Sequence, residues 1–153
     1  FDAHTPDGLE YRESDAFTAG DEVVVCECDG VLFGLAICYD LRFPVWSRNR
    51  NDYDLLVNAA NWPAARRDVW LTLLRARAIE NLCYVAGINR IGTDGAGIRY
   101  NGDSLILGPK GEKIAGAGKD RTCSVTADLS LQTLEAFRTK FPAHLDADIF
   151  KIL

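Results

Sequence analysis

Cysteine is the residue type in this chain best suited to covalent chemistry, and five cysteines occur among the 153 residues. Cys38 ends an apolar run and opens the polar stretch YDLRFP, residues 39–44, which is typical of a turn into a helix. A thiol at the carboxyl end of a strand lies where open α/β sheets bind ligands. A helix that starts there would favour the thiolate and offer N–H donors to an oxyanion. Cys38 is therefore a candidate nucleophile, and the alternative is an ordinary buried thiol.

The other cysteines and the histidines offer weaker candidates. An odd number of cysteines excludes a complete set of disulfides within one chain, so we expect reduced thiols. Cys26 and Cys28 form a CxC pair with no third or fourth ligand nearby, and we expect structural thiols and no metal site. His4 and His144 are the two histidines, and neither lies in a motif that suggests a Cys–His dyad. We interpret both as surface residues.

The elements that would position Cys38 begin with a hairpin. Two β-rich runs, residues 23–28 and 31–37, flank Asp29 and Gly30, which are typical of a type I′ turn. Further along the chain we predict a short helix beginning at residues 43–46, a strand over 54–60, a helix over 66–82 and a strand over 83–88. This alternation of strands and helices indicates an α/β protein with Cys38 at the exit of a strand.

The flanking segments are less regular. Residues 1–21 are predicted to form a long loop, and residues 90–102 a glycine-rich loop without the lysine or helix of a phosphate loop, so we expect no cofactor. Strands are predicted over 104–107, 113–115 and 123–127, followed by a helix from its cap Ser130 to about Thr139. The chain contains no internal repeat or linker, which indicates one domain or part of one.

Composition excludes several classes of function. The 17 Lys and Arg residues are outnumbered by 22 Asp and Glu residues, the formal net charge is −5, and no segment concentrates positive charge. Nucleic acid is therefore not an expected partner. No apolar run approaches the roughly 20 residues that cross a bilayer, and the N-terminus lacks the order of a signal peptide. We expect a soluble, cytoplasmic protein with no membrane partner.

Several motifs together resemble the nitrilase superfamily of carbon–nitrogen hydrolases. They are GLAICYDLRFP at 34–44, NWP at 61–63, RARAIEN at 75–81, YNGDS at 100–104 and PKGE at 109–112. The likeness extends from Glu13 to the C-terminus. Within the superfamily, residues 38–49, NWP, NRIGTDG at 89–95 and the tail with FP at 141–142 and DAD at 146–148 are most similar to bacterial omega-amidases. Those enzymes deamidate 2-oxo acids that carry a terminal amide, such as 2-oxoglutaramate.

This resemblance implies a fold and a set of catalytic groups. The fold would be the four-layer α-β-β-α sandwich, with residues 1–153 forming the C-terminal part of a single domain that lacks its N-terminal portion. Cys38 would be the nucleophile, Glu13 the second glutamate that orients substrate and catalytic groups, and the backbone N–H of Tyr39 one half of the oxyanion hole. The general-base glutamate and the lysine of the family would lie upstream, the lysine in a Lys-x-His-Leu-Phe motif whose last residue is Phe1.

Further side chains have both a functional and a structural interpretation. Arg42 could reach a substrate carboxylate or form an ion pair with Asp40 that shapes the turn. Trp62 could wall the substrate pocket or belong to the core. Arg77 and Glu80, at helical spacing, are interpreted as a structural pair.

The sequence thus predicts an amidase in which Cys38 forms a thioester, ammonia leaves and water releases the acid. The expected partners are a small amide substrate, water and a second copy of the chain, in a homodimer or larger homo-oligomer that shields Phe141, Ile149 and Phe150. We expect Cys38 to be the most reactive thiol of the complete enzyme. The alternatives are another amidase of the superfamily, an N-carbamoyl hydrolase, or a truncated module without catalytic activity.

Overall fold

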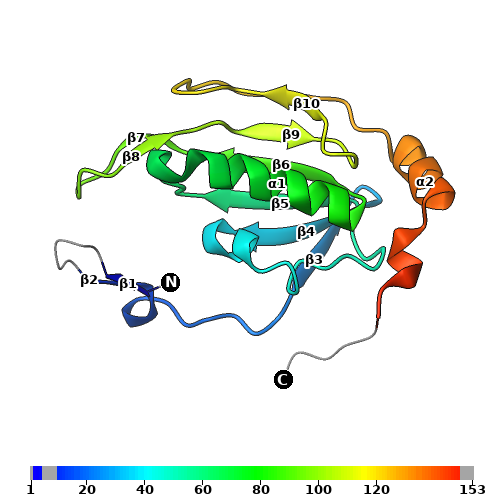
Figure 1. The fold of residues 1–153 in the computed structure, drawn as a ribbon, viewed down its shortest axis with the longest axis horizontal. Helices are drawn as coiled ribbons and strands as arrows, with labels where there is room; N and C mark the ends of the chain where they lie inside the picture. The colour runs from blue at the N-terminus through cyan, green and yellow to red at the C-terminus, as the bar shows by residue number, and fades with distance from the viewer. Residues whose placement is uncertain (1, 5–9, 149–153) are drawn as a thin grey trace.

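A mixed six-stranded β-sheet is the centre of the computed structural model, which describes residues 2–4 and 10–148 (Figure 1). The strand order is β10-β9-β6-β5-β4-β3. The two central pairings, β4 with β5 and β5 with β6, are parallel, and the outer pairings are antiparallel. The strands are β3 (Val24–Cys28), β4 (Val31–Ile37), β5 (Leu55–Ala60), β6 (Tyr84–Asn89), β9 (Leu105–Leu107) and β10 (Lys113–Gly116).

The predicted hairpin that leads to Cys38 is confirmed. β3 and β4 pair in antiparallel register around Asp29 and Gly30, whose φ angles of 51° and 78° are those of a type I′ turn. β4 then runs parallel to β5, so Ile37 lies opposite Ala59. The carboxyl ends of these two strands therefore meet at one edge of the sheet.

The helix α1 (Arg67–Asn81) covers one face of the sheet, as Figure 1 shows over β5 and β6. Trp70, Leu74 and Ala78 point into the sheet and are buried. Gly87 of β6 allows the close approach, because a Cβ atom there would lie 2.4 Å from a methyl carbon of Leu74. The main hydrophobic core is thus the layer between α1 and the sheet, which confirms the helix predicted over 66–82.

The helix α2 (Leu131–Lys140) is fixed to the end of the sheet by one arginine. The predicted cap is present, since Ser130 Oγ accepts a hydrogen bond from Thr133 N–H at 3.1 Å. Arg138 donates to the carbonyl oxygens of Leu82 and Tyr53 and pairs with the Asp54 carboxylate at 2.9 Å.

Three sequence predictions are corrected by the structure. Residues 43–46 form turns and no helix. The predicted loop over 90–102 contains a hairpin of β7 (Ile91–Thr93) and β8 (Arg99–Asn101), whose turn is held by Asp94 Oδ1 accepting from two backbone N–H groups. Within the predicted loop over 1–21, the described residues include β1 (Asp2–His4), β2 (Glu10–Arg12) and the 3₁₀ turn η1 (Glu13–Asp15).

The predicted strand over 123–127 is also wrong. Val125, Ala127 and Leu129 are half-buried and alternate with exposed residues, as they would in a strand. In the described part of the chain this segment has no ladder partner, and Ala127 and Leu129 instead line a hollow together with Leu55 and Tyr84 at the end of the sheet.

The second face of the sheet is apolar and open to solvent in this chain. Leu35, Ile37 and Ile88 project from it and are exposed, because β4 and β6 turn alternate residues away from α1. No helix among the described residues is long and apolar enough to cross a bilayer. The α/β class is confirmed, and the described residues contribute one sheet layer and one helix layer of the expected sandwich.

Candidate active site

Cys38 lies at a sharp turn between β4 and the 3₁₀ turn η2 (Cys38–Arg42). Its φ of 44° falls in the left-handed region, which is uncommon for a residue other than glycine and is concentrated at functional sites. The Asp40 carboxylate stabilises the turn by accepting a hydrogen bond from Ile37 N–H at 2.8 Å. The geometry resembles a nucleophile elbow, with a five-residue 3₁₀ turn in place of the expected α-helix.

The thiol of Cys38 faces the end of the neighbouring strand. It is half-buried against the core, and Sγ lies 3.9 Å from the carbonyl oxygen of Asn61, just beyond β5. Trp62 and Pro63 continue this segment into η3 (Ala64–Arg66) and α1. The parallel pairing of β4 and β5 therefore brings the Asn61 segment to the nucleophile.

Burial raises the pKa of the Cys38 thiol above its ordinary value. The backbone of Asn61 and the Arg66 cation oppose this rise in pKa, whereas the charges of Glu13 and Asp40 add to it. The sequence prediction that the turn itself favours thiolate is thus corrected, because desolvation outweighs the short turn. Attack by Cys38 requires a base that removes the proton.

Glu13 is brought to Cys38 from a segment distant in sequence. It opens η1 and is half-buried, and its negative charge acts on the thiol. The residue predicted as the second glutamate thus acts electrostatically on the predicted nucleophile, and both catalytic roles stay predictions.

Trp62 is buried and only 3% exposed, beside Cys38 and within the core. Its ring lies 5.5 Å from that of Trp70, and its Nε1–H donates to the Arg66 carbonyl at 2.8 Å. The Arg42 guanidinium lies 5.2 Å from the Trp62 ring centroid and 5.9 Å from that of Tyr39. Arg42 therefore contacts aromatic rings, while the expected partner Asp40 binds the backbone of Ile37.

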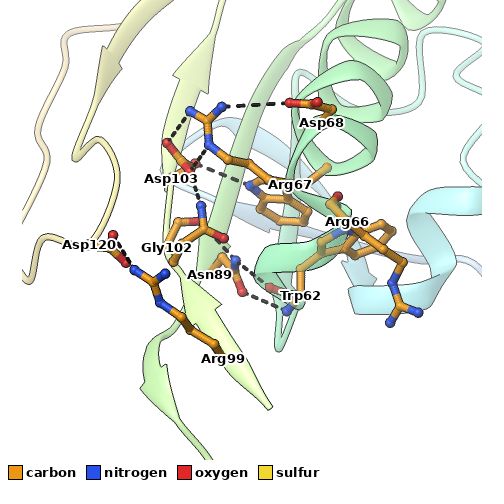
Figure 2. Close-up of polar contacts among 11 residues, drawn as sticks. Trp62, Arg66, Arg67, Asp68, Asn89, Arg99, Gly102, Asp103 and Asp120 are labelled. Carbon is orange, nitrogen blue, oxygen red and sulfur yellow. Dashed lines mark hydrogen bonds and ion pairs between the residues drawn. The ribbon is translucent and has the colours of Figure 1, made fainter. Parts of the chain in front are cut away.

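Two residues of the site are missing from the sequence predictions. Arg66 is exposed, and in Figure 2 its side chain points away from the adjacent Arg67–Asp103 ion pair. Asn89 ends β6 and binds the backbone of Trp62. An arginine four residues after Trp62 and an asparagine at the end of a buried strand are the only sequence signals for them.

The remaining predicted residues fit non-catalytic roles. The described residues contain no group of three His, Cys, Asp or Glu side chains that could hold a metal ion. Cys26 and Cys28 are exposed free thiols on β3. His144 was interpreted as a surface residue and is instead half-buried in η4 (Ala143–Asp146), while the side chain of His4 lies outside the described part of the structure. Arg77 and Glu80 form the expected pair at 2.6 Å. Phe1, Ile149 and Phe150 lie outside the described residues.

Comparison with known proteins agrees with this geometry. Residues 1–139 match the carbon-nitrogen hydrolase family, and the chain belongs to that family. It is 52% identical over 136 residues to "Omega-amidase YafV" of Escherichia coli K12, covering 89% of this chain and 53% of that protein. It is 37% identical over 148 residues to "2-oxoglutaramate amidase" of Bacillus subtilis, covering 90% and 56%.

A solved structure shares the fold. The protein XC1258 of Xanthomonas campestris, described as a CN-hydrolase superfamily protein with an arsenic adduct in the active site, superposes with a TM-score of 0.87 at 39% identity. The match covers 97% of this chain and 63% of that structure. The chain spans about half the length of the curated relatives it matches.

Proposed function

We propose that this chain carries the nucleophile of an amidase that hydrolyses the terminal amide of a 2-oxo acid such as 2-oxoglutaramate. The observation that carries the proposal is the thiol of Cys38, held in a strained turn at the sheet edge within electrostatic reach of Glu13 and Arg66. The printed names of two relatives, an omega-amidase and a 2-oxoglutaramate amidase, support the substrate class.

The reaction would proceed through a thioester. The Cys38 thiolate attacks the amide carbon, and the backbone N–H of Tyr39 donates to the developing oxyanion. The amide nitrogen accepts a proton, the carbon–nitrogen bond breaks and ammonia leaves. Water then adds to the thioester carbonyl, the carbon–sulfur bond breaks, and the carboxylic acid and the thiol are released.

The raised pKa of Cys38 defines what else this mechanism needs. A base must take the thiol proton and later activate water. We assign Glu13 the orienting role that the resemblance to the nitrilase superfamily implies. The resemblance also implies a general base and a lysine, which we assign to residues other than 1–153.

Two arginines are candidates for the carboxylate end of the substrate. Arg66 is exposed, its charge acts on Cys38, and no ion pair links it to another described residue. Arg42 is half-buried beside Trp62. A 2-oxo acid amide carries its carboxylate at the end opposite the amide, so a guanidinium near the nucleophile would orient the amide toward Sγ.

The test uses the complete product of the gene that encodes these residues, with residues 1–153 assayed in parallel. Ammonia release from 2-oxoglutaramate is expected for the complete product and is expected to be lost in Cys38→Ala. The exposed cysteine substitution Cys123→Ser is the control and is expected to retain activity. Arg66→Gln is expected to raise KM by about tenfold, which would identify the carboxylate contact.

The same experiment separates the alternatives. Hydrolysis of N-carbamoyl compounds or simple aliphatic amides in preference to 2-oxoglutaramate would replace the proposed substrate with another of the superfamily. Absence of activity on every short amide would favour a non-catalytic module.

We also propose that the protein is cytoplasmic and forms a homodimer or larger homo-oligomer. All five cysteines are free thiols, which suits a reducing compartment. Phe141 and Leu145 are exposed near the C-terminus, where a second copy could cover them. Light scattering of the complete gene product tests the association, and a stable monomer would contradict it.

A further inference from the structure

We propose that Asn89 is a positioning residue for the nucleophile, because its side-chain amide fixes the peptide group whose carbonyl oxygen faces the Cys38 thiol. This inference rests on the proposed role of Cys38. It concerns the peptide between Asn61 and Trp62, just beyond the end of β5.

The side-chain amide of Asn89 binds both backbone polar groups of Trp62, as the backbone of a neighbouring β-strand would. Its Oδ1 accepts from Trp62 N–H at 2.8 Å, and its Nδ2 donates to the Trp62 carbonyl at 3.1 Å. A third hydrogen bond, from Nδ2 to the Gly102 carbonyl at 2.9 Å, uses the remaining donor of the amide. Figure 2 shows these contacts joining the Trp62 segment to Gly102, the residue that follows β8 (Arg99–Asn101). The side chain thus extends the β5–β6 pairing past its last main-chain partners.

The link to the nucleophile follows from peptide geometry. The N–H of Trp62 and the C=O of Asn61 belong to one planar trans peptide, so they point in opposite directions. Asn89 holds the N–H, and the C=O is therefore directed to the other side, where it lies 3.9 Å from Cys38 Sγ. Fixing one atom of this peptide fixes the other.

Asn89 is itself rigidly held. It is only 8% exposed, Ser104 Oγ accepts from its backbone N–H at 2.9 Å, and the same hydroxyl donates to its carbonyl at 3.1 Å. Beyond Gly102, Asp103 pairs with Arg67 Nε at 2.7 Å and Nη2 at 3.0 Å. Asn89 is held by Ser104, and the residue after its partner Gly102 is held by Arg67. These contacts restrict the Asn61–Trp62 peptide, which faces Cys38, to one orientation.

The test compares two buried asparagines in the complete gene product. Asn89→Ala removes the three side-chain hydrogen bonds to Trp62 and Gly102 and leaves those of the Asn89 backbone in place. Asn49→Ala is the matched control, because Asn49 is 2% exposed and its side-chain hydrogen bonds go to Tyr53, Asn81 and Asp52, none of them to the Asn61–Trp62 peptide. The readouts are the thermal midpoint, kcat and KM, and the pH dependence of Cys38 alkylation by iodoacetamide.

Both variants are expected to lower the thermal midpoint. Only Asn89→Ala is expected to lower kcat, by about tenfold or more, and to displace the pH midpoint of Cys38 alkylation, because only this change frees the Asn61–Trp62 peptide. Unchanged kcat and an unchanged alkylation profile in a folded Asn89→Ala protein would contradict the proposal and show that Asn89 has only a structural role. If that variant is insoluble, Asn89→Ser decides by the same readouts, since its shorter side chain cannot reach both polar atoms of Trp62.

Alkylation also keeps the two proposals distinguishable. It requires only a folded protein and the thiol, so it reports on Asn89 even if no amide substrate is hydrolysed. If the wild-type gene product hydrolyses no amide but Asn89→Ala still displaces the pH midpoint of Cys38 alkylation, the proposed function is rejected and the positioning role of Asn89 is retained.

Discussion

Cys38 and Cys83 show how surroundings separate a candidate nucleophile from a core thiol. Cys83 is fully buried between α1 and the sheet, and burial raises its pKa to about 12. Cys38 is half-buried, lies in a strained turn, and is acted on by the charges of Glu13, Arg66 and Asp40. The pKa of each thiol is raised, but Cys83 has no exposed surface, whereas Cys38 is partly exposed at the end of β4.

The raised pKa of Cys83 predicts a loss of stability at alkaline pH. Between its ordinary value near 9 and about 12, the unfolded state loses the thiol proton while the folded state retains it. The free energy of unfolding therefore decreases as pH rises, by about 1.4 kcal/mol between pH 8 and pH 10 from this group. Urea unfolding of the wild type and of Cys83→Ala at both pH values measures the effect. Equal pH dependence in the two proteins would contradict the assignment.

Sequence motifs singled out Cys38 and Glu13 as candidate site residues, but they could not single out Arg66 and Asn89 in the same way. Asn89 depends on which strands are neighbours, because it lies on β6 and binds Trp62, which follows β5. Arg66 depends on the fold as well, because its charge acts on Cys38, which is 28 positions earlier in the sequence. The electrostatic balance at Cys38 was also out of reach of the sequence, since burial outweighs the short turn. Roles that depend on spatial contacts require the fold.

At the scale of elements, Gly87 controls how closely α1 packs on β6. An added Cβ would lie 2.4 Å from Leu74 Cδ1 and 2.9 Å from Trp70. Gly87→Ala is expected to lower the free energy of unfolding by about 1–3 kcal/mol, because an overpacked core shifts its side chains. Gly20→Ala is the control, since nothing lies within 4 Å of its Cβ. Denaturant titration of both variants gives the comparison, and equal stability would show that α1 can move outward at little cost.

Arg138 is the second element-scale prediction, because it connects α2 to Tyr53 and Asp54 just before β5 and to Leu82 before β6. Arg138→Met leaves the Asp54 carboxylate without its ion-pair partner and removes the side-chain donor to the Leu82 carbonyl. The Tyr53 carbonyl loses one of its two donors and keeps the hydrogen bond from Asn49 Nδ2. The expected loss is about 3 kcal/mol of unfolding free energy. Arg99→Met removes the exposed pair with Asp120 and should cost less than about 1 kcal/mol. Similar losses in both variants would mean that Arg138 does not anchor the helix.

Elements with a strong period were predictable, and those defined by context were not. The apolar spacing of α1 and the β-rich run of β4 predicted both elements within a few residues. The β7–β8 hairpin was missed because the Asp94 carboxylate closes its turn within a glycine-rich segment. Residues 123–127 have strand-like alternation but no neighbouring strand, so a ladder could not form.

At the scale of the whole molecule, the sheet is apolar on both faces although α1 covers only one. Val24 pairs with Leu35, which pairs with Val57 on the next strand, and this row points away from α1. Val24 and Leu35 are about half exposed. Strands that are apolar on both faces are typical of sheets covered on both sides, which agrees with the expected four-layer sandwich.

We therefore expect residues 1–153, produced alone, to self-associate through this face and to bind the dye ANS. Leu35→Lys should reduce both effects, because it places a charge at the centre of the apolar row. Leu131→Lys, an exposed leucine on α2, is the control and should change neither. In a gene product that completes the sandwich, Leu35 would be buried. There Leu35→Lys should be harmful, because it would destabilise the fold. Light scattering and ANS fluorescence that show a monomer without dye binding would mean that this face does not require a second layer.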